Sequence, residues 1–260
     1  MKKKKYRVEL FLYVLLFFCL VAEKKNYDRQ TSDSRETVQI EKQVKQENEQ
    51  KKQEKKIAYL TFDDGPSQVT NRVLDILDAY EIKGTFFLIG SSITEDQKAT
   101  VLRMKQEGHA IGIHTYSHKA EEMYQSADAF EHDFLKAERR LKKIVGENTT
   151  LYRFPWGSAN NYLRNIESDV LPWLEQKGYY YCDWNVSGED SVGTPTSYSI
   201  YRNVQKDYDR YTEPVILLHD SATNELTAQV LPDIIVMLKD SGYQFSTLDQ
   251  MERPYQYERN

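Results

Sequence analysis

Short apolar runs alternate with longer amphipathic stretches from Ile57 to the C-terminus of the chain. A short apolar run bounded by turn or charged residues predicts a strand, whereas apolar residues at three- and four-residue spacing predict a helix. The runs predict strands at Ile57–Phe62, Thr85–Ile89, Ala110–Ile113, Thr150–Phe154, Tyr179–Trp184, Val215–Leu218 and Gln244–Leu248. The amphipathic stretches predict helices at Arg72–Tyr80, Glu95–Glu107, Ala127–Val145, Tyr162–Lys177, Ser197–Asp207 and Glu225–Asp240.

Alternating strands and helices favour parallel strands joined by crossover helices, and therefore an α/β fold. About seven strands in one domain favour a closed or nearly closed barrel. An open doubly wound sheet is the alternative. That alternative has no glycine-rich dinucleotide loop to support it, because the glycines of the chain do not follow the G-x-G-x-x-G spacing.

The first 22 residues have the pattern of an export signal. Lys2–Lys5 precede an uncharged apolar run, Leu10–Ala22. As a helix this run reaches about 20 Å, short of the roughly 30 Å hydrocarbon core of a membrane. We therefore interpret residues 1–22 as an export signal, either cleaved or retained as an anchor in the cytoplasmic membrane. The rest of the chain is then outside the cell, anchored facing outward or secreted.

Residues 23–56 differ in composition from the remainder of the chain. Eighteen of these 34 residues are charged, and none is Gly or Pro. Such a segment has too little apolar surface to order itself, so we expect a charged stalk, disordered or forming a solvated single helix. Residues 57–260 then form one domain, with 20 basic and 31 acidic residues. This acidic balance argues against a nucleic-acid partner, and the two Cys of the chain cannot build a disulfide framework.

Unusual polar residues gather where the predicted strands end, which is where barrel enzymes place their active sites. They are Asp63 and Asp64 after the first strand, His114 and His118 after the third, Arg153 at the end of the fourth, Asp190 beyond the fifth and His219 after the sixth.

Asp64, His114 and His118 predict a metal site. Two His four residues apart can bind one metal, and a two-His, one-carboxylate set leaves coordination positions open for catalysis. The adjacent carboxylates of Asp63 and Asp64 are also costly to ionise together without a cation. Some iron oxygenases use the same ligand set, but they are usually built on antiparallel strands, which the alternation disfavours.

His219 is a candidate general acid, because imidazole changes its charge near neutral pH. A nearby Asp190 would raise its pKa, and Arg153 would be functional if it held a carboxylate in a bidentate pair. Trp156 and Trp184, each taken alone, are more typical of a core than of a sugar platform.

Together these residues resemble the polysaccharide deacetylase family, carbohydrate esterase family four, also called the NodB homology domain. The five family motifs occur in order and cover essentially all of residues 57–260. They are Thr61-Phe62-Asp63-Asp64-Gly65-Pro66-Ser67, His114-Thr115-Tyr116-Ser117-His118, Arg153-Phe154-Pro155-Trp156-Gly157, Asp183-Trp184-Asn185 through Asp190, and Leu217-Leu218-His219-Asp220.

The resemblance implies a distorted (β/α)7-type barrel and a role for each motif residue. Asp63 would be the general base and His219 the general acid. One divalent metal, zinc in the first place and Co, Ni or Mn as alternatives, would bind to Asp64, His114 and His118. Arg153 would orient the base, and Asp190 would tune the acid.

The remaining motif residues would shape the substrate site. The backbone N–H of Trp156, between Pro155 and Gly157, would help hold the oxyanion, and Leu217 would line the pocket for the acetyl methyl group. The family often has Trp directly after the fourth-motif Asp, where this chain has Ser191. Either the groove beside the acid is more open, or Trp184 takes the place of that Trp.

The implied function is metal-dependent removal of N-acetyl groups from a cell-wall or extracellular polysaccharide, with peptidoglycan as the first choice. An O-acetyl esterase acting on xylan, or an enzyme acting on chitin-type oligosaccharides, would use the same residues. An inactive glycan-binding barrel would have lost a base, ligand or acid, and none is lost here. We expect a monomer whose partners are an N-acetylated glycan and, through residues 1–22, the membrane.

Overall fold

The computed structural model describes residues 56–258. The strands are β1 (Ile57–Gly65), β2 (Thr85–Ile89), β3 (Ala110–Thr115), β4 (Leu151–Tyr152), β5 (Tyr180–Tyr181), β6 (Val186–Ser187), β7 (Val215–His219) and β8 (Gln244–Phe245). The α-helices are α2 (Gln68–Ala79), α3 (Lys98–Gln106), α4 (Ala120–Met123), α5 (Ala127–Val145), α6 (Glu167–Gln176), α7 (Ser197–Asp207) and α8 (Glu225–Asp240). Short 3-10 turns lie at Gly90–Ser92, Leu163–Asn165, Tyr208–Arg210 and Leu248–Gln250.

The segments predicted at 1–22 and 23–56 lie outside the described residues, except for Lys56. Between residues 56 and 258, no helix has both the length and the apolar character needed to cross a membrane.

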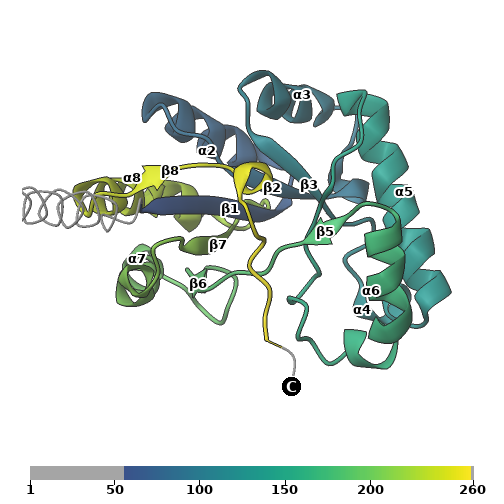
Figure 1. Ribbon diagram of the computed structural model, residues 1–260. Helices are drawn as coiled ribbons and strands as arrows, with labels where there is room; N and C mark the ends of the chain where they lie inside the picture. The colour runs from purple at the N-terminus through teal and green to yellow at the C-terminus, as the bar shows by residue number, and fades with distance from the viewer. Residues whose placement is uncertain (1–55, 259–260) are drawn as a thin grey trace, which may run out of the picture. The chain divides into compact units, whose positions relative to one another are not determined.

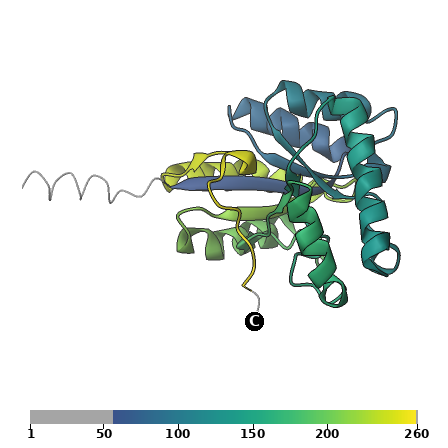
Figure 2. The same ribbon diagram turned by 45° about the vertical axis from the view of Figure 1, so that its right-hand side comes forward.

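The strands form one parallel sheet in the order β5-β4-β3-β2-β1-β7-β6, and β8 pairs with the first residues of β1. Helices surround this sheet, with α2 and α3 on one side of β1 and α7 on the other (Figures 1 and 2). Neighbouring helices contact one another in the order α7, α8, α2, α3, α5, α6. The predicted α/β fold with parallel strands is confirmed.

The barrel is curled but not closed by strand pairing. Among the described residues, no ladder joins its end strands β5 and β6. The C-terminal segment enters this seam, where the amide of Asp183 donates to the carbonyl of Tyr255 (2.8 Å) and the amide of Tyr257 donates to Oδ2 of Asp183 (3.0 Å). In Figure 1 this yellow segment passes between β5 and β6. The barrel is therefore distorted, as expected for the family, and its seam is completed by the C-terminal segment.

Two strands extend further than the apolar runs indicate. The ladders of β1 continue through Asp63, which pairs with Phe87 on β2 and with His219 on β7, to Gly65. Strand β3 likewise continues through His114 to Thr115. Asp63, Asp64 and His114 are thus strand residues and not residues that follow a strand. The reason is that a parallel ladder uses backbone groups, which polar side chains also possess.

Local sequence signals fix the helices that support the strand ends. Ser67 caps α2, where its Oγ accepts from the amide of Val69, and the same hydroxyl donates to the carbonyl of Asp220 (2.6 Å). This ties the start of α2 to the end of β7. Helix α5 buries one apolar face, formed by Phe130, Phe134, Ala137 and Leu141, and is capped by Gly146, whose positive φ of 82° suits glycine.

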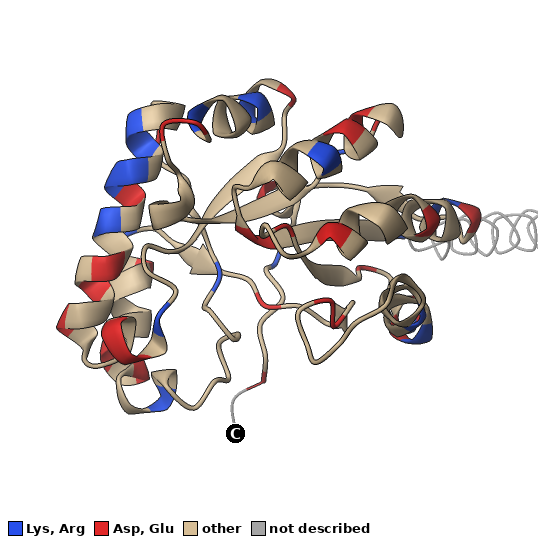
Figure 3. Cartoon of the chain, turned by 180° about the vertical axis from the view of Figure 1, so that it is seen from behind, with Lys and Arg blue, Asp and Glu red and all other residues tan. Residues whose placement is uncertain are grey.

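Charged side chains occupy the helices around the sheet. In the view of Figure 3, both acidic and basic residues occur on these helices.

Candidate metal centre and catalytic site

The predicted catalytic and metal-binding residues come together at the carboxyl ends of the strands. Asp63 and Asp64 lie on β1, His114 lies on β3 and His219 ends β7. Arg153 follows β4, and Asp190 lies beyond β6. The structure therefore gathers residues that are far apart in the sequence at one edge of the sheet.

Asp64, His114 and His118 form a three-ligand cluster. Oδ1 of Asp64 lies 3.4 Å from Nε2 of His114 and 3.3 Å from Nε2 of His118. This carboxylate oxygen is buried and has no hydrogen-bond partner among the described residues. A buried oxygen without a partner is costly, and a cation would relieve that cost. The cluster thus fits a divalent metal.

The protonation of His114 also fits a ligand. Its Nδ1 lies 2.8 Å from the carbonyl oxygen of Arg153, so Nδ1 carries the proton and Nε2 presents its lone pair to the cluster. Burial, only partly opposed by the nearby charge of Asp64, lowers the pKa of His114 to about 3. The ring is therefore neutral, which is the form that binds metal.

The turn that carries His118 is held by a residue that the sequence analysis did not single out. Asp133 on α5 is buried, and its Oδ1 accepts from the hydroxyl of Thr115 and from the amide of Tyr116, both at 2.6 Å. Its Oδ2 accepts from the amide of Ser117 at 2.9 Å. In the sequence, Asp133 directly precedes Phe134 on the buried face of α5. An acidic residue on an apolar helix face is unusual, and this is the sequence signal that could have indicated a role for Asp133.

Three of the five described non-glycine residues with positive φ lie at this site; the other two are Glu81 and Glu189. Asp64, His118 and Trp156 have φ values of 75°, 54° and 63°. L-residues rarely adopt this left-handed region, and such residues persist where the surrounding structure holds them, often at functional sites. The backbone conformation is therefore a second indication, besides the metal-binding side chains, that this is a functional site.

Asp63 is fixed by Arg153. Nη1 of Arg153 donates to Oδ1 of Asp63 at 3.0 Å and to the hydroxyl of Thr61 at 2.7 Å. The guanidinium is fully buried, and it also donates to the carbonyls of Cys182 (2.8 Å) and Asp183 (3.1 Å). Burial raises the pKa of Asp63, and Arg153 offsets part of this rise. The arrangement suits a carboxylate that receives a proton during catalysis.

His219 is paired with Asp190. Nδ1 of the ring and Oδ1 of Asp190 are 2.7 Å apart, and the backbone amide of His219 donates to Oδ2 at 2.7 Å. Thr227 donates to the same Oδ2 at 2.6 Å, and Asn224 donates to the carbonyl of Asp190 at 3.1 Å. Burial alone would lower the pKa of His219, but the hydrogen bond and charge of Asp190 raise it to about 9. The ring is thus held in its proton-donating form.

The other predicted residues lie around this centre. Trp156 is exposed, with its ring 4.8 Å from that of His118, and the carbonyl of Pro155 accepts from the hydroxyl of Tyr124. Leu217 is buried two residues before His219, on the same face of β7.

Trp184 packs between the C-terminal segment and the loop at Gly157. It packs against Tyr257, with ring centroids 5.5 Å apart, and a Cβ added to Gly157 would lie 3.0 Å from it. Ser191, which follows the fourth-motif Asp, accepts a hydrogen bond from Nδ2 of Asn224 at 3.0 Å.

Asp183 is a second positioning residue without an assigned role in the sequence analysis. Its buried carboxylate accepts from the amide (2.8 Å) and the hydroxyl (2.6 Å) of Ser158, as well as from the amide of Tyr257. It therefore links the loop after Trp156 to the C-terminal segment, next to the carbonyls that anchor Arg153.

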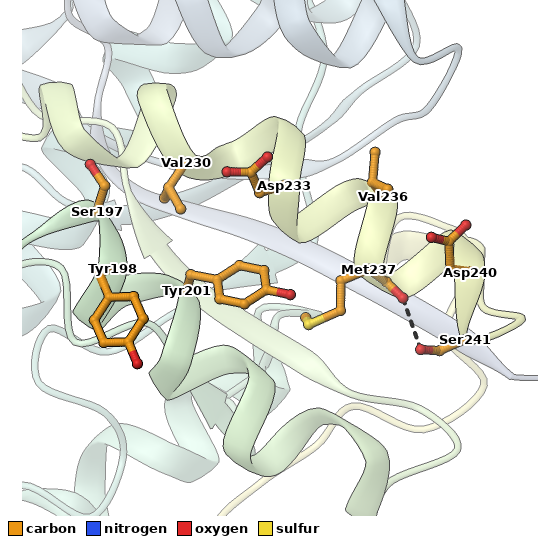
Figure 4. Close-up of a pocket in the computed structure, with 9 residues that line it drawn as sticks. All are labelled: Ser197, Tyr198, Tyr201, Val230, Asp233, Val236, Met237, Asp240 and Ser241. Carbon is orange, nitrogen blue, oxygen red and sulfur yellow. Dashed lines mark hydrogen bonds between the residues drawn. The ribbon is translucent and has the colours of Figure 1, made fainter.

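A cavity of about 570 Å³ lies elsewhere, between α7 and α8 (Figure 4). Tyr198, Tyr201 and Met237 are among its lining residues, and none of the residues in the catalytic cluster is.

The chain matches the family model described as polysaccharide deacetylase over residues 50–170. It is also 31% identical over 196 residues to a peptidoglycan-N-acetylglucosamine deacetylase of Bacillus cereus, a match that covers 74% of this chain and 69% of the relative. The chain belongs to the polysaccharide deacetylase family.

Two solved structures place this polysaccharide deacetylase among relatives of the same fold. The catalytic domain of a peptidoglycan N-acetylglucosamine deacetylase from Eubacterium rectale has a TM-score of 0.73 and 31% identity, covering 79% of this chain and 94% of that one. A family 4 acetyl xylan esterase from Clostridium thermocellum, solved with a cobalt ion, has a TM-score of 0.63 and 28% identity, covering 75% and 89%. The resemblance inferred from the motifs is confirmed.

Proposed function

We propose that this polysaccharide deacetylase hydrolyses N-acetyl groups of a cell-wall glycan, with peptidoglycan as its first substrate. One observation carries the proposal. Asp63 and His219 are paired neighbours on β1 and β7, and each is fixed by its own partner, Arg153 at 3.0 Å and Asp190 at 2.7 Å. This pairing supports the roles of Asp63 as base and His219 as acid beside the three-ligand cluster. The relatives named as peptidoglycan deacetylases support peptidoglycan as the polymer.

A divalent metal held by Asp64, His114 and His118 would supply Lewis acidity, which favours both ionisation of water and polarisation of the acetyl carbonyl. Asp63, oriented by Arg153, accepts a proton from the attacking water as the water oxygen bonds to the acetyl carbon. The backbone N–H of Trp156 donates to the developing oxyanion. His219 gives its proton to the amide nitrogen as the C–N bond breaks, so acetate and a free amine are released. We assign zinc as the first choice of metal, with Co, Ni or Mn as alternatives.

The test is acetate release by the purified full chain from defined muropeptides and chitooligosaccharides. Activity should disappear after chelation and return when one of these metals is added. Glycan substrates that release no acetate at any metal loading would overturn the proposal.

A second candidate is an O-acetyl esterase acting on xylan, favoured by the similarity to the Clostridium thermocellum esterase. The same base and acid would serve, with a sugar hydroxyl as the leaving group. The ratio of kcat/KM on acetylated xylan to kcat/KM on N-acetylated glycans distinguishes the two candidates.

For the segments that precede the domain we propose an export signal or membrane anchor at 1–22 and a charged stalk at 23–56. The domain of residues 57–260 would then act outside the cell, as a monomer within reach of the wall. Cell fractionation and N-terminal sequencing of the mature protein test this organisation. Recovery of the intact chain in the cytoplasm would contradict it.

A further inference from the structure

Two exposed aromatic side chains lie together beside the candidate metal centre. Trp156 is 48% exposed and Tyr162 is 55% exposed, and their ring centroids are 5.6 Å apart. The ring of Trp156 is also 4.8 Å from that of His118. Aromatic surface therefore continues outward from a predicted metal ligand. An exposed aromatic pair next to a reaction centre is unusual for a surface that binds nothing.

The pair is held in place by buried groups. The ring of Tyr162 stacks on that of Tyr124, with centroids 6.1 Å apart and planes 6° apart. Tyr124 is buried, and its hydroxyl donates to the carbonyl of Pro155 at 3.2 Å. Tyr162 therefore rests on a buried ring that is itself bonded to the residue before Trp156.

The loop between the two aromatic residues is also pinned. Nδ2 of Asn160 donates to the carbonyl of Gly157 at 2.7 Å, and its Oδ1 accepts from the amide of Leu163 at 2.8 Å. A surface that is ordered before its ligand arrives loses less entropy on binding.

On the β6 side, the residues directly after Asp190 are not aromatic: they are Ser191 and the exposed Val192. Trp156 follows β4 and Ser191 follows β6, and these two strands lie on opposite sides of β1 in the sheet. Ser191 is an exposed small residue. The exposed aromatic pair that adjoins a predicted metal ligand therefore lies on the β4 side.

We propose that Trp156 and Tyr162 form a glycan-binding platform on which a pyranose ring next to the acetylated sugar packs its C–H face. This inference rests on the proposed function and deepens it, because it assigns a binding site for a second sugar of the polymer. Pyranose rings offer an apolar face edged with hydroxyls, and Tyr and Trp match this with a flat apolar ring and one polar group. Tyr162 is the residue to test, because its ring contacts Trp156 but the hydrogen bonds and ion pairs of Asp63, Asp64, His114, His118 and His219 do not involve it.

The test compares the full chain with Tyr162→Ala, Tyr162→Phe and a control, Tyr198→Ala, which removes an exposed aromatic ring from α7. Each protein is assayed for acetate release from N-acetylglucosamine tetramer and from 4-nitrophenyl acetate, which carries no sugar. Tyr162→Ala should raise KM for the tetramer about tenfold, the scale of one aromatic contact, with little change in kcat. Tyr162→Phe and Tyr198→Ala should resemble the unchanged protein. Rates on 4-nitrophenyl acetate should be equal in all four proteins, which shows that the folded site is intact.

An unchanged KM of Tyr162→Ala on the tetramer would overturn the platform, and so would an equal loss on 4-nitrophenyl acetate. The failure of the proposed function would look different, because the unchanged protein would then release no acetate from any glycan. Quenching of Trp fluorescence by the tetramer gives a binding readout, and it should need about tenfold more ligand in Tyr162→Ala than in Tyr162→Phe.

Discussion

Asp190 holds His219 through both of its carboxylate oxygens: Oδ1 lies 2.7 Å from Nδ1 of the ring, and Oδ2 accepts the backbone amide of the same residue at 2.7 Å. One carboxylate therefore fixes the orientation of the ring and stabilises its positive charge. Burial lowers the pKa of His219, and the hydrogen bond and charge of Asp190 are the largest of the effects that raise it.

The first prediction concerns this pair. The pKa of His219 is raised to about 9, so the acid form persists up to that pH and the alkaline limb of the rate profile should fall near it. In Asp190→Asn the pKa should drop, and the alkaline limb should move to lower pH. Profiles of kcat/KM against pH for both proteins on one substrate measure the shift. A limb that stays in place in an otherwise active variant would show that Asp190 does not tune the acid.

His114→Ala should remove most of the bound metal and activity while the fold remains. The reason is that Nε2 of His114 faces Oδ1 of Asp64 at 3.4 Å and is one of three ligands. Metal content by mass spectrometry and the melting temperature give the two readouts. His132→Ala, an exposed His on α5, serves as the control and should keep its metal. Equal metal content in both variants would contradict the ligand assignment.

Asp63→Asn should keep the metal and lose about a hundredfold or more in kcat, the scale of general base catalysis. An amide oxygen still accepts from Arg153, so the geometry of the site should be preserved, but the amide cannot accept the proton of water. Metal content and kcat measured on the same preparation test this. Loss of the metal would show that Asp63 also acts as a ligand.

Asp133→Asn should weaken metal binding about 10- to 100-fold, as expected for residues that orient ligands. The change removes an acceptor for the amides and hydroxyl of residues 115–117, and so loosens the turn that carries His118. Competition with a chelator measures the affinity. Asp128→Asn, an exposed acid in the first turn of the same helix, should bind metal as tightly as the unchanged protein. Similar affinities in both variants would refute the role of Asp133.

A shortened chain that begins at Lys55 should match the full chain in melting temperature and in kcat/KM on soluble oligosaccharides. The described residues, 56–258, belong to one compact unit, and their buried core begins at Ala58. The charged segment before it has few apolar residues with which to pack. Calorimetry of both chains decides the question. A clearly lower melting temperature of the shortened chain would mean that the segment packs on the domain.

Much of the fold was predictable because each strand and helix carries its own periodic signal. The spacing of Phe130, Phe134, Ala137, Leu141 and Ile144 predicted α5; the first four side chains are buried, and Ile144 is partly buried. The strand β6 was missed because two residues, Val186 and Ser187, are too short to show a period. The extensions of β1 and β3 were missed because polar side chains ended the apolar runs before the backbone ladders ended.

The sequence by itself determined the order of the strands and helices. It also determined the candidates for the acid, the base and the metal ligands, since each candidate lies in a short motif of adjacent residues. The resemblance also indicated Arg153 and Asp190 as the partners of the base and the acid, but only the tertiary structure decided that Asp133 and Asp183 hold the surrounding loops. Asp133 reaches the His118 turn from α5, and Asp183 joins the Trp156 loop to Tyr257, which lies 74 residues further along the chain. A lone acid in a sequence reads as a surface residue, because carboxylates are usually solvated. Its role appears only when folding removes it from water and leaves amides and hydroxyls of distant segments as its hydrogen-bond partners.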